Sequence, residues 1–298
     1  MSDLQTKAGF VSVVGRPNSG KSSLLNWLIG EKLALVSHKA NATRKRMNFI
    51  VMYKNTQIIF IDTPGIHQKE RLLNQFMLEE TLKAMGDCDL ILFLASAKDS
   101  IDEYEKFLKL NKKNTPHIVL LTKMDIVSKD ELLKKISQYQ KFQNVYKELV
   151  PISIKKGTKQ NELLNIISKY IPIHPYLYDP ELLTTENLKE IYKEYIREAL
   201  FNNFSDEIPY LSDVIVEKVE EGERLDKIFA NIITEKKSQK GMIIGKSGSA
   251  IKRIGIEARK NIEKLSDKKV FLKLEVIVKP RWSKDKKALS DLGYRVEK

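Results

Sequence analysis

A segment near the start of the chain has the residues of a phosphate-binding loop. Residues 15–22 read Gly-Arg-Pro-Asn-Ser-Gly-Lys-Ser, which fits the pattern G-x-x-x-x-G-K-[ST]. The glycines let the backbone turn so that several N–H groups point at one anion. Lys21 can reach the outer phosphates, and the Ser22 hydroxyl can bind Mg²⁺. The residues that we assign to phosphate binding are Gly15, Arg16, Pro17, Asn18, Ser19, Gly20, Lys21, Ser22 and Ser23.

The residues on either side of this loop predict the elements that it requires. Phe10–Val14 is a short apolar run, which predicts a buried strand, and 23–29 has an apolar helical face. A glycine-rich turn formed by chance is the alternative interpretation. The strand–loop–helix setting disfavours that alternative and favours a nucleoside triphosphate site.

Two further segments carry oxygen ligands suited to Mg²⁺ and the terminal phosphate. Asp62-Thr63-Pro64-Gly65 directly follows the apolar run 57–61. The Asp62 carboxylate can hold Mg²⁺ through water, and the Gly65 N–H can meet the γ-phosphate. Thr43, in the polar segment 37–45, can complete the Mg²⁺ shell and release it after hydrolysis. We therefore expect Ser22, Thr43 and Asp62 to bind the metal, and Lys21, Asn18 and Thr43 to act in catalysis.

Residues after two later apolar runs predict guanine as the base. The Asp125 carboxylate can accept hydrogen bonds from guanine N1–H and N2–H₂, a donor pair that adenine lacks. Lys123 can lay its stem along the ring, and backbone N–H groups after residue 152 can reach the guanine O6. The residues assigned to the base are Thr122, Lys123, Met124, Asp125, Ser153 and Ile154. An ATP-dependent kinase or ATPase is the alternative, and Asp125 argues against it.

The C-terminal part contains a G-x-x-G loop, Gly245-Lys246-Ser247-Gly248, between apolar and basic residues. In KH domains such a loop clamps about four nucleotides by their backbone. The RNA-binding residues that we predict are Gly245, Lys246, Ser247, Gly248, Lys252, Arg253 and Arg259. A helix–turn–helix connection without RNA binding is the alternative. Residues 241–247 also look like a second phosphate loop, but they have one residue too few between the glycines and no companion motif.

Composition limits the class of protein. The chain has 298 residues, 42% of them hydrophobic, and a single cysteine, Cys88, so neither an internal disulfide nor a cysteine-based zinc site is possible. Cys88 is expected in the core. The longest apolar run, 90–95, is too short to span a bilayer, and the N-terminus lacks a signal-peptide layout. These features predict a cytoplasmic protein.

The net charge of +13 is unevenly distributed. Residues 236–298 contain 19 Lys and Arg against 7 Asp and Glu, whereas 181–235 contain 6 against 14. A basic end behind an acidic stretch predicts a surface for a polyanion. A lysine-rich solvated surface without a partner is the alternative.

The order of apolar runs predicts two domains. Residues 1–172 alternate strands with helices, which predicts an α/β P-loop GTPase domain with a mostly parallel sheet and helices on both faces. Residues 173–183, with two of three closely spaced prolines, predict an extended linker. Residues 184–298 predict an α+β KH-type domain in the prokaryotic arrangement with a basic C-terminal tail, in which Trp282 is expected in the core.

These motifs, in this order, resemble those of the translation-factor-type GTPases and, more closely, the Era family of KH-domain GTPases. The resemblance covers nearly the whole chain. It implies GTP hydrolysis, binding of the 3′ end of small-subunit ribosomal RNA and a role in small ribosomal subunit assembly. The sequence departs from the family pattern at three positions: Thr122 replaces an asparagine, Ile154 replaces an alanine, and Ala42 leaves Thr43 as the one candidate threonine ligand in its segment.

The residues around the phosphate predict slow intrinsic hydrolysis. Ile66 stands where Ras-like enzymes have a glutamine that orients water, and an isoleucine cannot do so. Asn18 has two interpretations: similar GTPases use an asparagine there to hold K⁺, or Asn18 serves only a tight turn. Arg16 and Arg44 are expected near solvent, without a catalytic role.

The leading hypothesis is a monomeric switch in which GTP orders 37–45 and 65–76 and so changes the grip on RNA. The cofactors are then Mg²⁺ and, on the first interpretation of Asn18, K⁺. The alternative is a signalling or membrane-associated GTPase whose C-terminal domain binds protein. The basic face also allows peripheral contact with the inner face of the cell membrane as an alternative.

Overall fold

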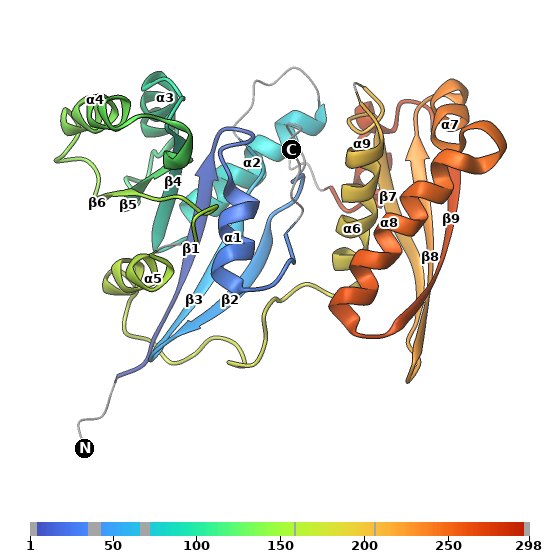
Figure 1. The fold of residues 1–298 in the computed structure, drawn as a ribbon, viewed down its shortest axis with the longest axis horizontal. Coiled ribbons are helices and arrows are strands. Elements are labelled where there is room, and N and C mark those ends of the chain that lie inside the picture. The colour runs from blue at the N-terminus through green and yellow to red at the C-terminus, as the bar shows by residue number, and fades with distance from the viewer. Residues whose placement is uncertain (1–4, 35–42, 66–71, 158, 206, 295–298) are drawn as a thin grey trace. The chain divides into compact units, whose positions relative to one another are not determined.

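A computed structural model describes residues 5–34, 43–65, 72–157, 159–205 and 207–294 (Figure 1). The chain divides into two compact units. The first holds most of the residues up to Thr185, and the second contains Glu186 and everything after it. Each unit has a sheet and a hydrophobic core of its own.

The first unit is built on a six-stranded sheet in the order β2-β3-β1-β4-β5-β6. Its strands are β1 (Lys7–Gly15), β2 (Met47–Tyr53), β3 (Thr56–Asp62), β4 (Leu90–Ser96), β5 (His117–Thr122) and β6 (Glu148–Pro151). Only the pairing of β2 with β3 is antiparallel among these strands, so the predicted mostly parallel sheet is confirmed. Every residue of β3, β4 and β5 is buried, as expected of strands covered on both faces.

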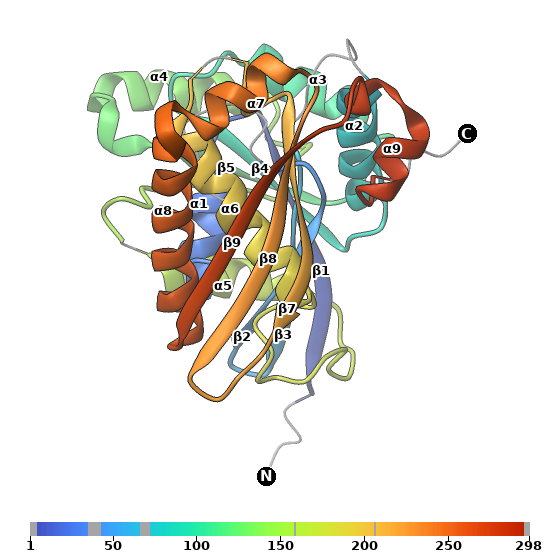
Figure 2. The same ribbon diagram turned by 90° about the vertical axis from the view of Figure 1, so that its right-hand side faces the viewer.

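Helices lie on both faces of this sheet, with α1 and α5 on one side and α2 on the other (Figure 2). The helices of the first unit are α1 (Lys21–Ile29), α2 (Leu72–Gly86), α3 (Asp102–Leu110), α4 (Lys129–Gln140) and α5 (Gln160–Lys169). Ser128 and Glu131 form a capping box at the start of α4, which fixes where that helix begins. α2 is given from Leu72, because 70 and 71 lie outside the described residues.

The proline-rich segment after α5 lies against the sheet of the first unit. The side chain of Gln57, fully buried in β3, accepts hydrogen bonds from the N–H groups of Leu177 and Tyr178 at 2.8 and 3.0 Å. Its amide nitrogen donates to the Tyr178 carbonyl at 2.8 Å. Further along, the Ile50 N–H donates to the Leu183 carbonyl at 2.8 Å, and the Thr184 hydroxyl donates to the Asn48 carbonyl at 2.6 Å. The segment is thus bonded to both β2 and β3.

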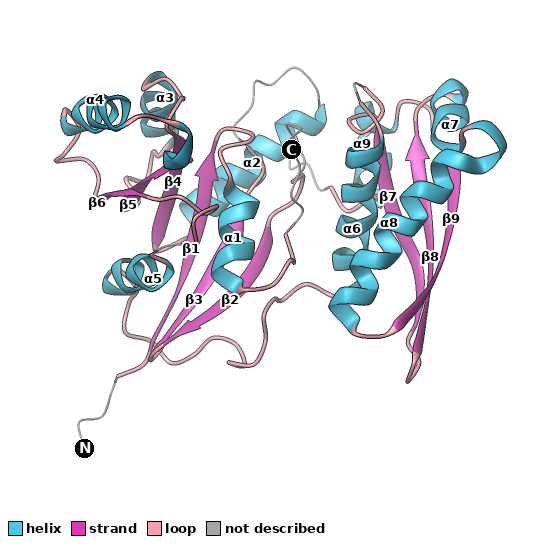
Figure 3. Ribbon diagram, in the orientation of Figure 1, coloured by secondary structure: helices cyan, strands magenta, loops and turns pink. Residues whose placement is uncertain are grey.

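The second unit is a three-stranded sheet, β7-β8-β9, covered on one face by helices (Figures 2 and 3). Its elements are α6 (Leu188–Asn203), β7 (Ser212–Glu220), β8 (Leu225–Thr234), α7 (Lys237–Ile244), α8 (Ser249–Ser266), β9 (Lys269–Val278) and α9 (Lys286–Asp291). β7 is antiparallel and β9 parallel to β8. The elements follow the order helix, strand, strand, helix–loop–helix and strand, so the predicted α+β domain is confirmed. Inward residues of the strands pack with α6 and α8 into one core.

The C-terminal residues are part of this second unit. Trp282 is fully buried, and its indole N–H donates to the Leu211 carbonyl at 3.1 Å, so its expected place in the core is confirmed. The Tyr294 hydroxyl donates to the buried Asp213 carboxylate at 2.6 Å. Cys88 in the first unit is half-buried, and burial raises the pKa of its thiol to about 11. Among the described residues, none of the helices has the length and apolar character needed to cross a bilayer.

His117, at the start of β5, makes the stability of the first unit sensitive to acid. The imidazole is buried, and its Nε2 lies 2.7 Å from the Tyr104 hydroxyl. Burial lowers the pKa of His117 to about 4, so the unfolded chain binds a proton there first as pH falls. The stability contributed by neutral His117 is therefore complete above pH ~6.5 and is lost toward pH ~4, a change of about 3 kcal/mol.

The measurement is urea unfolding at several pH values, followed by Trp27 in a Trp282→Phe background where it is the remaining tryptophan. A His117→Asn variant is the control, because it keeps the acid response of the carboxylates. The difference between the two free energies of unfolding isolates the histidine. Identical pH profiles for the two proteins would contradict the assignment.

Candidate functional site

Lys21 is a buried cation at the first residue of α1, and its ammonium lies against the loop that follows β1. Its ammonium donates to the carbonyls of Gly15 and Arg16 at 3.1 and 3.0 Å. Burial lowers the pKa of Lys21 to about 8, and the charge of Asp62 acts in the opposite direction. The two carbonyls only partly replace water around this cation. An anion in the loop would therefore bind strongly, because its negative charge would stabilise the poorly solvated ammonium.

Three side-chain oxygens meet beside this lysine. Ser22 Oγ lies 3.1 Å from Asp62 Oδ2 and 3.3 Å from Thr43 Oγ1, and Thr43 Oγ1 lies 3.2 Å from Asp62 Oδ2. Neighbouring ligands of a six-coordinate Mg²⁺ with bonds of 2.0–2.1 Å are roughly 2.9 Å apart. The three oxygens therefore fit Mg²⁺ in chemistry and spacing. A single carboxylate with two hydroxyls leaves positions for phosphate oxygens and water.

The segment after β3 packs closely on the phosphate loop. A Cβ atom on Gly65 would lie 2.8 Å from the nitrogen of Pro17, so only glycine permits this approach. The Thr63 hydroxyl donates to the Val13 carbonyl at 2.6 Å, and the Pro64 carbonyl accepts from Thr81 at 3.0 Å. The Gly65 backbone is thereby held beside the loop. Ile66, and with it the expectation about water positioning, lies outside the described residues.

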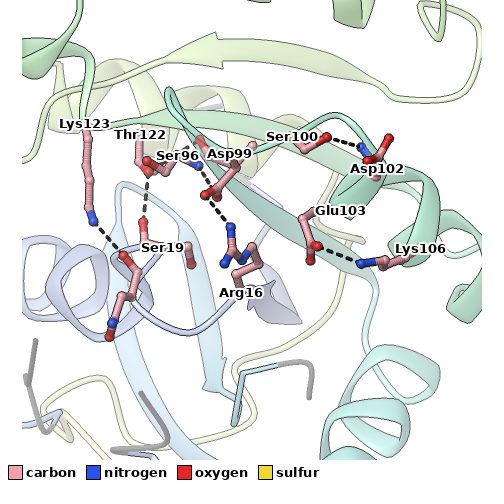
Figure 4. Close-up of polar contacts among 12 residues, drawn as sticks. Arg16, Ser19, Ser96, Asp99, Ser100, Asp102, Glu103, Lys106, Thr122 and Lys123 are labelled. Carbon is pink, nitrogen blue, oxygen red and sulfur yellow. Dashed lines mark hydrogen bonds and ion pairs between the residues drawn. The ribbon is translucent and has the colours of Figure 1, made fainter. Parts of the chain in front are cut away.

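The two motifs for base and phosphate are joined by direct hydrogen bonds (Figure 4). The Thr122 hydroxyl donates to the Ser19 carbonyl at 2.8 Å, and the Lys123 ammonium donates to the Asn18 carbonyl at 2.7 Å. Thr122 thus reaches the loop from the position where the related pattern has an asparagine. Asn18 has φ = 62°, a left-handed conformation that asparagine tolerates. This agrees with the interpretation in which Asn18 serves a tight turn.

Asp125 is oriented by a neighbour from a different strand end. The Ser153 hydroxyl, after β6, donates to Asp125 Oδ1 at 2.8 Å. That hydrogen bond is the main cause that holds the pKa of Asp125 below its usual range, aided by its own backbone and by Lys155 and Lys156. The carboxylate is ionised at neutral pH and accepts hydrogen bonds, which is the state needed to bind guanine N1–H and N2–H₂.

The remaining predicted residues lie around the same loop. Ser23 is in the first turn of α1, Met124 begins a short 3₁₀ turn, and a Cβ on Gly20 would lie 3.8 Å from Ile154 Cδ1. Arg16 is half-exposed and pairs with Asp99 at 3.1 Å (Figure 4). The expectation that Arg44 lies near solvent is wrong: it is 2% exposed, because the chain there already returns toward β2.

The G-x-x-G loop joins α7 to α8. Gly245, Ser247 and Gly248 all have positive φ, of 72°, 51° and 75°. Lys246 and Ser247 are exposed at its tip, and Lys252, Arg253 and Arg259 are exposed along α8. The seven residues predicted for RNA thus lie on one loop and the helix that follows it. Ile243 and Ile254 are buried in the core, whereas Ile251 faces a groove.

That groove, of about 540 Å³, runs between α8 and β9. Its described lining residues include two cations, Lys252 and Arg259, and no acidic side chain. The full lining is Ile251, Lys252, Gly255, Ile256, Arg259, Val270, Phe271, Leu272 and Leu274. An apolar floor with a cationic rim suits the bases and phosphates of a single strand.

Three contributors to these sites were not identified from the sequence. Asp99 holds Arg16, Gln57 anchors the segment after α5, and Phe271 lines the groove. Phe271 alone had a usable signal, since an aromatic residue on the outward side of a predicted strand departs from the expected polar pattern. The other two depend on contacts between distant segments.

A nucleotide pocket specific for guanine, followed by a KH fold, defines the class of KH-domain GTPases. A family model described as "50S ribosome-binding GTPase" matches residues 10–123, and one described as "KH domain" matches 207–283. The GTPase Era of Campylobacter concisus is 53% identical over 97% of this chain and 100% of its own. GTPase Era of Helicobacter pylori strain G27 is 52% identical over 98% of both chains. The chain therefore belongs to the GTPase Era family, and its activity is GTP hydrolysis.

Two solved structures match nearly the whole chain. A single-residue variant of Aquifex aeolicus Era bound to GDP·AlF₄⁻ has a TM-score of 0.92 and 33% identity, covering 98% of this chain and 100% of its own. An Era in complex with MgGDPNP and nucleotides 1506–1542 of 16S ribosomal RNA gives the same values. The agreement extends over both units of the chain.

Replacing Asp125 by asparagine should change the base that the protein binds. Guanine N1–H and N2–H₂ need two acceptors, and the carboxamide of asparagine offers one acceptor and one donor. GTP affinity should therefore fall at least about 100-fold. Xanthine has a carbonyl at C2 in place of the amino group, so XTP should bind better than GTP. Titration of both nucleotides against the variant checks this.

Ser153→Ala is the matched control for that substitution. It keeps the carboxylate and removes the hydrogen bond that orients it, so GTP affinity should fall by only about 5- to 10-fold, without a preference for XTP. GTP binding by Asp125→Asn at the wild-type level would show that this carboxylate does not read the base.

Proposed function

We propose that this protein is a GTP-hydrolysing switch that binds single-stranded RNA of the small ribosomal subunit and assists assembly of that subunit. The observation that carries the proposal is the combination, in one chain, of a guanine-nucleotide pocket and a cationic KH groove. The relative solved with MgGDPNP and a 16S rRNA fragment has the same combination over 98% of this chain. The RNA is then the 3′ part of small-subunit rRNA, and the protein acts as a monomer in the cytoplasm.

The nucleotide is held by backbone and side chains in separate roles. The N–H groups of the loop and the start of α1 bind the phosphates, and Lys21 adds its charge. Asp125 reads the base, while Thr122 and Lys123 hold the loop at a fixed distance from it. Mg²⁺, when bound by Ser22, Thr43 and Asp62, neutralises charge that develops on the phosphates during hydrolysis.

Two contacts make the pocket responsive to the γ-phosphate. The Gly65 N–H can reach the γ-phosphate because Gly65 lies against Pro17. Thr43 reaches the metal position from the other side, bonded to Asp62. Loss of the γ-phosphate removes the ligand that both approach, so hydrolysis releases both segments.

We propose in addition that K⁺ assists hydrolysis through Asn18. Ile66 follows Gly65 in the sequence, and its side chain cannot orient the attacking water, so intrinsic turnover is slow. Extra positive charge near the β- and γ-phosphates is the usual remedy in phosphoryl transfer. Asn18 sits at the turn of the phosphate loop, with its carbonyl fixed by Lys123.

An Asn18→Gly variant separates the two interpretations of this residue. Glycine tolerates φ = 62° but has no carboxamide, so the turn is kept and the proposed ligand is lost. Hydrolysis by the wild type should be at least several-fold faster in K⁺ than in Na⁺, and the variant should lose that difference. Equal rates in the two salts for the wild type would rule out the role of K⁺.

RNA would enter the groove beside the G-x-x-G loop. The glycines allow phosphates to approach the main chain, while Lys246, Lys252 and Arg253 supply charge. Bases lie against Ile251 and Leu274 in the groove. Gly255 helps to keep it open: a Cβ there would extend toward Leu274, to 3.7 Å from its Cδ1.

Gly248→Asp tests RNA binding without a steric clash in the loop. Nothing lies within 4 Å of a Cβ on Gly248, whereas one on Gly245 would meet Ala250 at 2.8 Å. A carboxylate at this site repels phosphate, so affinity for an RNA with the sequence of nucleotides 1506–1542 of 16S rRNA should fall at least tenfold. Filter binding or fluorescence anisotropy at fixed salt measures the loss.

Gly30→Asp is the matched control. Gly30 ends α1 with φ = 82°, close to the 75° of Gly248, and also has open space around it. It therefore imposes similar backbone strain and the same added charge in the first unit, and its RNA affinity should match the wild type. Equal affinities of all three proteins would rule out the G-x-x-G loop as the RNA-binding site.

A further inference from the structure

Asp99, in the turn after β4, pairs with an arginine of the phosphate loop. Its Oδ1 accepts a hydrogen bond from the Arg16 guanidinium at 3.1 Å (Figure 4). Its Oδ2 accepts one from the Ser96 N–H at 2.9 Å, and its own N–H donates to the Ser96 carbonyl at 2.9 Å. One carboxylate thus closes the turn and holds a residue of the loop.

The turn is itself fixed by two other elements of the first unit. The Ala97 N–H donates to the carbonyl of Thr122, at the end of β5, at 3.0 Å. The Lys135 ammonium, from α4, donates to the Asp99 carbonyl. Lys135 is buried, which lowers its pKa, and the charge of Asp99 acts in the opposite direction. The Asp99 carboxylate therefore has a fixed place whether or not Arg16 reaches it.

This fixed place distinguishes the ion pair from an ordinary one on the surface. Exposed pairs contribute little, because two mobile side chains lose rotamer freedom and water screens both charges. The Asp99 side chain is 15% exposed and already held by the turn, so the arginine alone loses freedom when the pair forms. Asp99 should therefore restrain Arg16 more firmly than a mobile carboxylate would.

The main chain of Arg16 forms part of the site of Lys21. The Arg16 carbonyl accepts a hydrogen bond from the Lys21 ammonium at 3.0 Å and another from the Ser19 N–H at 3.2 Å. The Gly15 carbonyl is the second acceptor of that ammonium, at 3.1 Å. A displacement of residue 16 would therefore move one of the two carbonyls that orient the phosphate-binding charge.

The second half of the loop is held by different contacts. Thr122 and Lys123 donate to the carbonyls of residues 19 and 18 at 2.8 and 2.7 Å (Figure 4). Within the described ranges, Arg16 forms no ion pair other than the one with Asp99. The contacts from β5 thus act on residues 18 and 19, and the contact from the turn after β4 acts on residue 16.

We propose that Asp99 is a positioning residue for the nucleotide site. Through the Arg16 guanidinium it fixes the first half of the phosphate loop, and with it the carbonyl that orients the Lys21 ammonium toward the phosphates. Asp99 itself does not touch the nucleotide. The inference concerns the nucleotide site and does not depend on RNA binding.

Replacing Asp99 by asparagine separates positioning from simple electrostatics by the sign of the effect. The carboxylate repels phosphates and occupies Arg16, so charge alone predicts tighter nucleotide binding when it is removed. If Asp99 positions the loop, the affinities of the full-length protein for GDP and GTP should instead fall about fivefold, as for loss of one charge-assisted hydrogen bond at a partly exposed site. Calorimetric titration of both nucleotides measures the change.

Glu103→Gln is the matched control for this loss of charge. Glu103, on α3, pairs with Lys106 at 2.8 Å and has no contact with the phosphate loop (Figure 4). The variant also replaces a carboxylate by its amide in the same unit, and its affinities for GDP and GTP should match those of the wild type.

A double-mutant cycle with Arg16 distinguishes positioning from a general loss of structure. Asp99→Asn also removes a charge near Lys135, so it should lower the stability of the first unit whatever its role at the loop. Arg16→Ala should weaken both nucleotides to a similar extent. Adding Asp99→Asn to Arg16→Ala should then cause no further loss of affinity, because both substitutions remove the same restraint.

Three results would overturn the proposal. They are unchanged nucleotide affinity in Asp99→Asn, tighter binding by that variant, and losses that add in the double variant. Absence of GTP binding by the wild type would instead contradict the nucleotide site itself.

Discussion

The buried ammonium of Lys21 is the interaction on which the nucleotide site depends. The loop encloses a cation and offers it two carbonyls, so the folded protein carries part of the desolvation cost of that charge until an anion arrives. Asp62 lies near enough to offset some of the cost, and it also gathers Ser22 and Thr43. The need to stabilise the buried charge of Lys21 thus organises the loop, the end of β3 and the segment before β2. A bound phosphate with its metal ion would supply the missing counter-charge.

The geometry of a parallel sheet explains why residues so far apart in sequence meet. β1, β3, β5 and β6 all end at the same edge, and each contributes its functional residues at or just after its carboxyl end. Thr122 and Lys123 then bond the base-reading segment to the loop. A displacement of the base-binding segment can therefore shift the phosphate loop through these two hydrogen bonds, without movement of the sheet.

Much of this arrangement could be predicted because strand ends and glycine-rich loops are local features of sequence. Lys21, Asp62, Asp125 and the G-x-x-G loop each follow a short apolar run with a turn residue, so their place on the fold follows from their immediate neighbours. Arg44 was misplaced because its burial depends on where the chain returns to β2, which no local pattern reveals. Gln57 and Asp99 were missed for the same reason: their partners are 120 and 83 residues away.

Because the segment after α5 is bonded to the sheet of the first unit, only a short stretch of chain is free to extend between the two units. Thr184 is still bonded to β2, and Asn187 already caps α6, so only Thr185 and Glu186 lie between. Three peptide links span at most about 11 Å. Residues inserted into the proline-rich stretch would bulge from the edge of the sheet and leave that reach unaltered, whereas residues inserted after Thr184 would lengthen it directly. The prolines thus act as part of the first unit, and the length of the tether depends on the two residues between Thr184 and Asn187.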